Sequence, residues 1–419
     1  MDRRVLFAAV ILFAGGATGV GVAAFAFVGL DDATAETEIL WQSTPANGDD
    51  GSGAVVATVD GDPAVVQPAV EGDDPVLRAI GPDGDRPWTT PLPAGAVGEI
   101  SDLASGELDG DPVVAFTTGA GELVAISADD GSERFVISLA STGGVPPAFG
   151  DVTGDGQTDL AAVDVDGGVR VVDAHGDVRF ETDLDGAVSL RPLIVDGEGS
   201  AADDEADESA GPNDGSDTTA GALAGSGLAV LTDRSDGQTV TTVDGGGDVV
   251  WTEPTASIVL SWNAADTTSG GVVALGGADG TLTTLETTDG SLRYAVGLQN
   301  VPVNVGGGDA GRIHVAGTGD IWAVDMLDGE VVWKQQYGGE TRVNAPTAGD
   351  LTGDGTLEII VVNREGELLG MNRNGEPVAR GGIGEAIVYA RPLAADLTGD
   401  GRDEVVVVTE DGTAIAVAT

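Results

Sequence analysis

Cysteine is absent from this sequence of 419 residues, and lysine occurs only once, at Lys334. Without cysteine there is no disulfide framework, no thiolate nucleophile and no cysteine-ligated zinc site. Basic residues are few overall, with 18 lysines and arginines against 70 acids and a net charge of −52. Because phosphate binding needs a basic stripe and these arginines are scattered, the charge argues against nucleic acid and anionic lipid headgroups as partners.

The acidity favours cations and cationic partners instead. At molar salt the screening length falls to about 3 Å, so a dense carboxylate surface costs little and keeps a protein soluble. In this respect the composition resembles that of proteins from salt-loving archaea. Hydrophobic residues make up 41% of the chain, which is enough for a sizeable core, so we expect a folded protein.

A long hydrophobic run lies at the N-terminus, where residues 5–30 form 26 consecutive positions without a charge, preceded by Arg3 and Arg4. At about 1.5 Å per residue such a helix is longer than a bilayer core of about 30 Å, and the arginines place its N-terminus inside the cell. We therefore expect residues 1–35 to be a single-pass membrane anchor, with the rest of the chain outside. The alternative is a signal peptide cleaved at Ala33-Thr34-Ala35, which would release a secreted protein.

Residues 36–419 repeat a unit of about 45 residues. A unit carries a turn and a short strand with an aromatic, as in GDRPW ending at Trp88 and GEVVW ending at Trp333. The same series includes Phe135, Phe180, Trp251 and Tyr294, with Ala379 in a copy that lacks the aromatic and Trp41 as a displaced eighth copy. An acid that opens a loop keeps the same period, at Asp60, Asp102, Asp151, Asp196, Asp266, Asp350 and Asp396.

The apolar runs within a unit are short, β-branched and separated by Gly/Asp turns, which predicts four strands per unit. Eight such units predict an all-β, eight-bladed β-propeller. The last unit lacks its outer strand, and residues 38–43 around Trp41 supply it, so we expect the N-terminal strand to close the ring. Residues 198–220 interrupt the repeat with eight acids and no base, which predicts a disordered insertion, or alternatively a tail that binds a partner.

Three copies of a nine-residue acidic loop occur in the repeats: DVTGDGQTD at 151–159, DLTGDGTLE at 350–358 and DLTGDGRDE at 396–404. Each gathers three carboxylates around two glycines, and carboxylates held close together repel one another until a hard cation lies between them. The glycines at loop positions four and six permit a tight turn around an ion. The loops therefore predict about three Ca²⁺ sites. The alternative is an acidic turn that is solvated by Na⁺ or K⁺.

These loops resemble the FG-GAP or VCBS repeats of integrin-α-like propellers, whose motif is Asp-x-Asn/Asp-Gly-Asp-Gly-x-x-Asp. The stretch AVDMLDGEVVW, Ala323 to Trp333, resembles the repeat of quinoprotein-like (PQQ-like, BamB-like) eight-bladed propellers. The resemblance covers about residues 38–419 and implies metal ligands at loop positions one, three, five, seven and nine. Those residues are Asp151, Thr153, Asp155, Gln157 and Asp159; Asp350, Thr352, Asp354, Thr356 and Glu358; and Asp396, Thr398, Asp400, Arg402 and Glu404.

The resemblance further implies that position seven contributes its carbonyl oxygen, whereas positions one, five and nine contribute carboxylates. Threonine stands at position three, where the family has Asn or Asp. A hydroxyl is a weaker ligand, which lowers the expected affinity for calcium.

Arg191 and Arg391 each precede a Pro-Leu pair at the same place in units that lie four apart. In an eight-fold ring they would face each other across the central channel, where two guanidinium groups could hold an anion. Recurrence of a repeat consensus is the alternative explanation for the pair.

The sequence contains no convincing catalytic cluster, because His175 lies in a turn and His314 in a strand at ordinary repeat positions. Quinoprotein dehydrogenases resemble the chain only in their blades, since typical members use a vicinal cysteine pair. We therefore expect not an enzyme but an exported, membrane-anchored, calcium-binding module for protein binding, scaffolding or adhesion at the cell surface. The alternatives are a PQQ-like quinoprotein dehydrogenase, a carbohydrate-active propeller enzyme, or an assembly factor for surface proteins.

Overall fold

The computed structural model describes residues 35–44, 53–72, 74–92, 100–197, 222–267, 269–309, 311–337, 339, 341–383 and 391–419. These residues form strands, turns and loops and no helix, so the described part contains no helical segment able to cross a membrane. The expected anchor at residues 5–30 and the expected disordered insertion at residues 198–220 lie outside the described residues. Both stay predictions.

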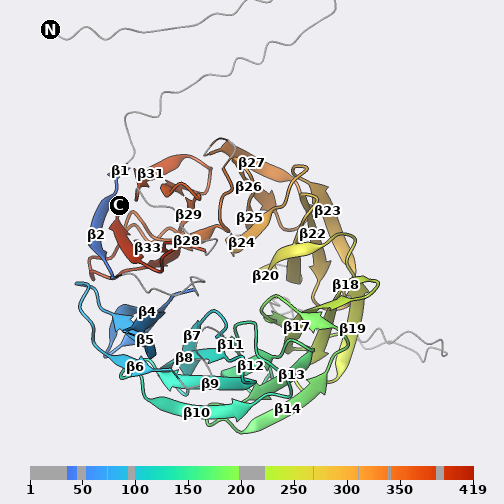
Figure 1. Cartoon of the computed structure of the whole chain (residues 1–419). Coiled ribbons are helices and arrows are strands. Elements are labelled where there is room, and N and C mark those ends of the chain that lie inside the picture. The colour runs from blue at the N-terminus through green and yellow to red at the C-terminus, as the bar shows by residue number, and fades with distance from the viewer. Residues whose placement is uncertain are drawn as a thin grey trace, which may run out of the picture. The chain divides into compact units, whose positions relative to one another are not determined.

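The described strands form eight sheets arranged in a ring, which confirms the all-β, eight-bladed propeller (Figure 1). The first two blades consist of β3 Val55–Val59, β4 Asp62–Glu71, β5 Asp74–Ile80 and β6 Thr89–Pro91, followed by β7 Ala104–Leu108, β8 Asp111–Thr117, β9 Glu122–Ser127 and β10 Glu133–Ser138. The third and fourth blades consist of β11 Ala148–Gly150, β12 Asp159–Val163, β13 Gly168–Val172 and β14 Val178–Asp183, followed by β15 Ala187–Val188, β16 Leu193–Asp196, β17 Ser226–Arg234, β18 Gly237–Asp244 and β19 Val249–Pro254.

The fifth and sixth blades consist of β20 Val259–Thr267, β21 Gly270–Gly277, β22 Thr281–Glu286 and β23 Leu292–Gly297, followed by β24 Asn304–Asp309, β25 Arg312–Ala316, β26 Asp320–Asp325 and β27 Val331–Gln336. The last two blades consist of β28 Thr347–Gly349, β29 Glu358–Val362, β30 Glu367–Met371 and β31 Pro377–Gly382, followed by β32 Leu393–Ala395, β33 Glu404–Val408 and β34 Ala414–Ala418. Consecutive paired strands within a blade are antiparallel, with the first strand next to the channel and the last at the rim (Figure 1).

The ring is closed by the N-terminal strand β2 (Glu38–Gln42), as predicted. It pairs antiparallel with β34 in the last blade, where Glu38 lies opposite Ala418. A second, unpredicted contact precedes it, because β1 (Ala35–Glu36) pairs in parallel with β31 of the seventh blade. The N-terminal segment is therefore tied to two successive blades.

The hydrophobic core lies between the blades, because each sheet packs face to face against its two neighbours. The middle strands are accordingly buried on both faces, and every residue of β12, β29 and β33 is buried. This explains why Val405–Val408 is a continuous apolar run instead of an alternating one. One such cluster joins the last blade to the first, and in it Trp41 and Val406 pack with Val65 and Ile80.

The repeated aromatic has a defined partner in the structure, a glycine in the turn before the outer strand of the next blade. Trp251 of the fourth blade lies on Gly290 of the fifth, whose φ is +73° and where an added Cβ would be 2.6 Å from the indole ring. The Trp251 Nε1–H donates to the Thr287 carbonyl at 2.8 Å. Trp41 packs on Gly84 of the first blade, without an indole hydrogen bond to any described residue, so the aromatic–glycine contact that joins neighbouring blades also joins the last blade to the first.

One acid of the predicted series is misplaced. The turn between β7 and β8 contains Asp109 and Gly110, which correspond to Asp60 and Gly61 between β3 and β4; both aspartates have positive φ. Asp102 instead precedes β7, and its Oδ1 accepts a hydrogen bond from the Gly53 amide at 2.7 Å. The prediction that Asp102 opens this loop was therefore wrong, because the period alone does not determine which of two nearby acids occupies the turn.

Candidate metal-binding loops

The three acidic loops join the innermost strand of a blade to its second strand. The first loop (151–159) joins β11 to β12, the second (350–358) joins β28 to β29, and the third (396–404) joins β32 to β33. Since all three follow an innermost strand of the same direction, they lie on the same face of the ring. The second and third loops belong to neighbouring blades.

The aspartate at position one organises each loop through backbone amides. In the second loop Asp350 Oδ1 accepts from the Gly353 amide at 2.7 Å, and its Oδ2 accepts from the Gly355 amide at 2.7 Å. Both glycines have positive φ, which turns their N–H groups toward the carboxylate. Burial acts to raise the pKa of Asp350, but the amide donors outweigh it and hold the pKa below its ordinary value.

The same arrangement recurs in the other two loops, so it is a property of the motif. The Gly156 amide donates to Asp151 Oδ2 at 2.8 Å in the first loop. In the third loop the Gly399 amide donates to Asp396 Oδ1 at 2.7 Å. The position-one carboxylates are thus held in place by the backbone amides of the turn.

The aspartate at position five accepts a hydrogen bond from the amide two residues later in all three loops. Asp354 Oδ1 accepts from the Thr356 amide at 2.8 Å, and Asp155 and Asp400 have the same contact to Gln157 and Arg402. The first loop differs in one respect, because Asp155 also forms an ion pair with Arg179 at 2.6 Å. That arginine neutralises part of the charge that a metal ion would otherwise balance.

The acid at position nine is buried in each loop, with exposures of 1% for Asp159, 3% for Glu358 and 3% for Glu404. Burial raises the pKa of these carboxyl groups, and the negative charge at position five of the same loop raises it further. The Oδ1 atom of Asp159 is buried without a hydrogen-bond partner among the described residues. A buried carboxylate next to another acid needs either a proton or a cation.

The threonines at position three contact the buried acids. Thr153 Oγ1 donates to Asp159 Oδ2 at 2.9 Å, and Thr398 Oγ1 donates to Glu404 Oε1 at 3.2 Å. Each hydroxyl keeps its oxygen lone pairs available while its proton is used on the carboxylate. In the first and third loops, position three therefore supports the acid at position nine, a role that the motif comparison did not suggest.

The donor set of each loop fits a hard cation such as calcium, since it consists of carboxylate, hydroxyl and carbonyl oxygens. In the described part of the chain, however, no three acidic or histidine side chains are grouped closely enough to hold a metal ion. The expected gathering of three carboxylates is therefore not seen. Amide donors fix the carboxylates of positions one and five separately, on different backbone groups of the turn.

A residue that sequence reasoning missed links two of the loops. Asp403, at position eight of the third loop, accepts from the Asp350 amide through Oδ2 at 2.8 Å, and its own amide donates to the Asp350 carbonyl at 2.8 Å. The sequence feature that could have indicated this link is the acid at position eight of the third loop, because the second loop has Leu357 at that position. The second and third loops are thus one connected unit.

The remaining predicted residues lie elsewhere in the ring. Arg191 and Arg391 precede the innermost strands of the fourth and eighth blades. His314 is 3% exposed in β25 and lies against the Trp333 ring, whereas His175 is exposed in a turn, 3.9 Å from Asp109. The two histidines are in different blades.

Residues 350–407, which contain the second and third loops, match the FG-GAP-like repeat family. The chain is an eight-bladed β-propeller that carries an FG-GAP-like repeat. The family match covers the two neighbouring loops that Asp403 joins. No curated protein matches the chain in sequence.

Solved structures with a similar fold cover most of the chain at low sequence identity. BamB from Moraxella catarrhalis is 16% identical with a TM-score of 0.56, covering 91% of this chain and 98% of its own. Sqt1 from Saccharomyces cerevisiae is 10% identical with a TM-score of 0.61, covering 92% and 98%. BBS1N in complex with ARL6DN is 15% identical with a TM-score of 0.53, covering 78% and 93%. At these identities the likeness concerns the fold alone.

Proposed function

We propose that this protein is a calcium-binding β-propeller that serves as a protein-binding or scaffolding module outside the cell, of haloarchaeal type, held at the membrane by residues 5–30. The observation that supports it is the recurrence of one loop, in one register, on one face of the ring, with a buried acid in each copy. The proposal involves no chemical turnover. The broad faces of the disc present the partner surface.

Calcium would be held by the acids at positions one, five and nine, the threonine at position three and the carbonyl at position seven. It would supply the positive charge that the buried acids Asp159, Glu358 and Glu404 require. The second and third loops favour this role more than the first, because Arg179 already pairs with Asp155 in the first loop. BBS1N, a propeller of similar fold, is in complex with the protein ARL6DN, which supports a protein-binding role for the scaffold.

Calcium should raise the melting temperature of the purified protein in molar KCl, and chelation should reverse the effect. A site present only in the folded state gains about 2.7 kcal/mol of stability at a free ligand concentration 100 times its dissociation constant. Glu404→Gln should remove most of the response from the third loop. Without calcium the same variant should be at least as stable as the wild type, because burial and Asp400 disfavour the charged form of Glu404. The measurement is thermal unfolding with and without a chelator.

The matched control is Asp60→Asn, which removes one charge from an exposed turn at the equivalent place in the first blade. This variant should respond to calcium as the wild type does. Equal melting temperatures with calcium and with chelator, at constant ionic strength, would refute the calcium proposal. An equal loss of the calcium response in Glu404→Gln and Asp60→Asn would also refute it.

The location outside the cell can be tested through the single lysine. Lys334 lies on the outer strand β27 with 49% of its side chain exposed, 2.8 Å from Asp320. An amine-reactive reagent that does not cross membranes should label the propeller in intact cells at native salt, at Lys334, and the label should be absent from Lys334→Arg. Labelling of this residue only after lysis would exclude an external propeller. A bifunctional version of the same reagent would capture a bound partner at this rim.

A further inference from the structure

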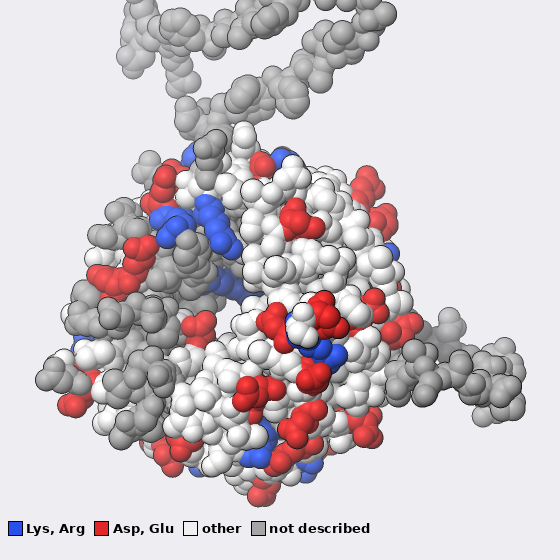
Figure 2. All heavy atoms as spheres, turned by 45° about the vertical axis from the view of Figure 1, so that its right-hand side comes forward, with Lys and Arg blue, Asp and Glu red and all other residues white. Residues whose placement is uncertain are grey.

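The centre of the ring contains a hollow that differs in chemistry from the rest of the protein. Its volume is about 410 Å³, and it is lined by residues of the innermost strands, among them Val55, Phe149, Arg191, Ile194 and Asn263. None of the residues that line it in the described part of the chain is acidic, although the chain holds 70 acids. Basic atoms are visible beside the hollow in the face shown in Figure 2.

Two arginines occupy equivalent places on opposite sides of this channel. Arg191 lies two residues before β16 in the fourth blade, and Arg391 lies two residues before β32 in the eighth blade. Three blades lie between them in either direction around the ring, as the positions of β17 and β33 show in Figure 1. Because they precede the innermost strands and the acidic loops follow them, the arginines and the loops lie at opposite ends of these strands.

The guanidinium groups of the pair have almost no partners. Arg391 forms no hydrogen bond or ion pair with any residue in the described part of the chain. Arg191 donates from Nη2 to Asn263 Oδ1 at 3.3 Å, and Asn263 is itself fixed by a bond from Nδ2 to the Gly306 carbonyl at 2.9 Å. By contrast, arginines at the periphery are paired, as Arg134 is with Asp111 at 3.0 Å.

The charge of Arg191 acts on Arg391. Burial lowers the pKa of Arg191, and burial together with the charge of Arg191 lowers the pKa of Arg391 to about 10. Two like charges on opposite sides of one channel, without an acidic partner among the described residues, destabilise the folded protein. A paired anion would remove that cost, and guanidinium groups are suited to bidentate contacts with carboxylate and phosphate-type oxyanions.

We propose that the channel is a binding site for a small oxyanion with two negative charges, held between Arg191 and Arg391, with Asn263 orienting the Arg191 guanidinium. The hollow beside Arg191 is large enough for a small molecule, and the absence of acids among its described lining residues favours binding of a dianion in an otherwise strongly acidic protein. The site depends on the ring and on these residues, and it is independent of calcium in the loops.

The test uses the full-length protein in KCl at constant ionic strength, with inorganic sulfate and succinate as separate probes. Either probe should raise the melting temperature to a plateau as its concentration increases. The probe that acts at the lower concentration shows whether the site prefers a tetrahedral oxyanion or a dicarboxylate. Arg391→Gln and Arg191→Gln should each weaken binding by about tenfold or more, since a charged hydrogen-bonding partner is lost. Without a probe, Arg391→Gln should melt at or above the wild-type temperature because it removes one of two repelling charges.

Arg86→Gln is the matched control, because it removes the same charge from the periphery, where Arg86 pairs with Glu71 at 2.9 Å. It should bind both probes as the wild type does. The proposal is overturned if neither probe stabilises the wild type, or if Arg86→Gln loses the response to the same extent as the channel variants. A lower melting temperature of Arg391→Gln without any probe would show that this arginine has a structural role instead.

Discussion

Replacing Trp41 by alanine should lower the free energy of unfolding by about 3–5 kcal/mol, the range for removing a large buried aromatic from a core. Trp41 is 9% exposed and packs in the cluster that joins the last blade to the first. Chemical denaturation followed by circular dichroism measures the loss. We also expect a smaller m-value, the slope of the unfolding free energy against denaturant concentration. An opened ring already exposes the facing surfaces of the first and last blades, so less surface is left to expose on global unfolding.

The loss should be larger than for most aromatics of the series because of the position of Trp41 in the chain. The other outer-strand aromatics lie in blades whose strands are consecutive in sequence, whereas β2 joins β34 across nearly the whole chain. Ile39→Ala is the control in the same strand, since Ile39 is 40% exposed. It should change the stability by less than about 1 kcal/mol. Equal effects of the two substitutions would mean that strand pairing alone, without the aromatic, closes the ring.

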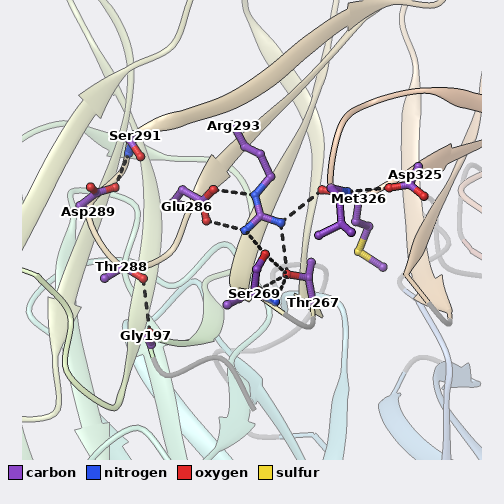
Figure 3. A network of polar contacts seen from close by, with 12 residues as sticks. Gly197, Thr267, Ser269, Glu286, Thr288, Asp289, Ser291, Arg293, Asp325 and Met326 are labelled. Atoms are coloured by element: carbon purple, nitrogen blue, oxygen red, sulfur yellow. Dashed lines mark hydrogen bonds and ion pairs between the residues drawn. The ribbon is translucent and has the colours of Figure 1, made fainter. Parts of the chain in front are cut away.

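Arg293→Ala should lower the free energy of unfolding by about 3 kcal/mol, because it leaves a partly buried carboxylate without its partner. The Arg293 guanidinium forms two bonds of 2.6 Å to Glu286 and also donates to Thr267, Ser269 and the Met326 carbonyl (Figure 3). Its side chain is only 8% exposed. Since Met326 belongs to the sixth blade and the other partners to the fifth, this one side chain links neighbouring blades.

Two comparisons separate that effect from a general loss of charge. Arg86→Ala removes an exposed ion pair, with side chains 38% and 44% exposed, and should cost less than about 1 kcal/mol. Adding Glu286→Gln to Arg293→Ala should recover part of the loss, because the carboxylate that lacks a partner is then neutral. If the double variant is as unstable as the sum of the two single variants, the ion pair contributes nothing and the packing of the Arg293 stem accounts for the effect.

Several features followed from local sequence patterns. The period of the aromatics predicted the outer strands, and the short β-branched runs predicted the inner ones. The shortage of one strand after Asp396 predicted that the stretch around Trp41 would join the last blade, as β2 does. Each of these predictions depends on residues within one repeat, so the spacing of residues along the chain is sufficient to make it.

Other features needed the assembled ring. The partner of each aromatic is a glycine in the following blade, and the parallel pairing of β1 with β31 joins Ala35 to Ala379, far apart in the chain. The contact between Asp403 and the Asp350 amide joins two loops that no local pattern relates. The burial of Glu358 and Glu404 depends on neighbouring sheets that cover the start of each second strand.

The sequence by itself determined the number of blades, the strand order within them and the places of the acidic loops, because antiparallel neighbours and tight turns obey short-range rules. Only the tertiary structure decided which charges meet. Arg191 and Arg391 lie on opposite sides of one channel because eight blades close into a circle, and Arg179 reaches Asp155 because two segments of one blade fold together. Electrostatic energy depends on distance through space and on burial, and both are set only when the ring has closed.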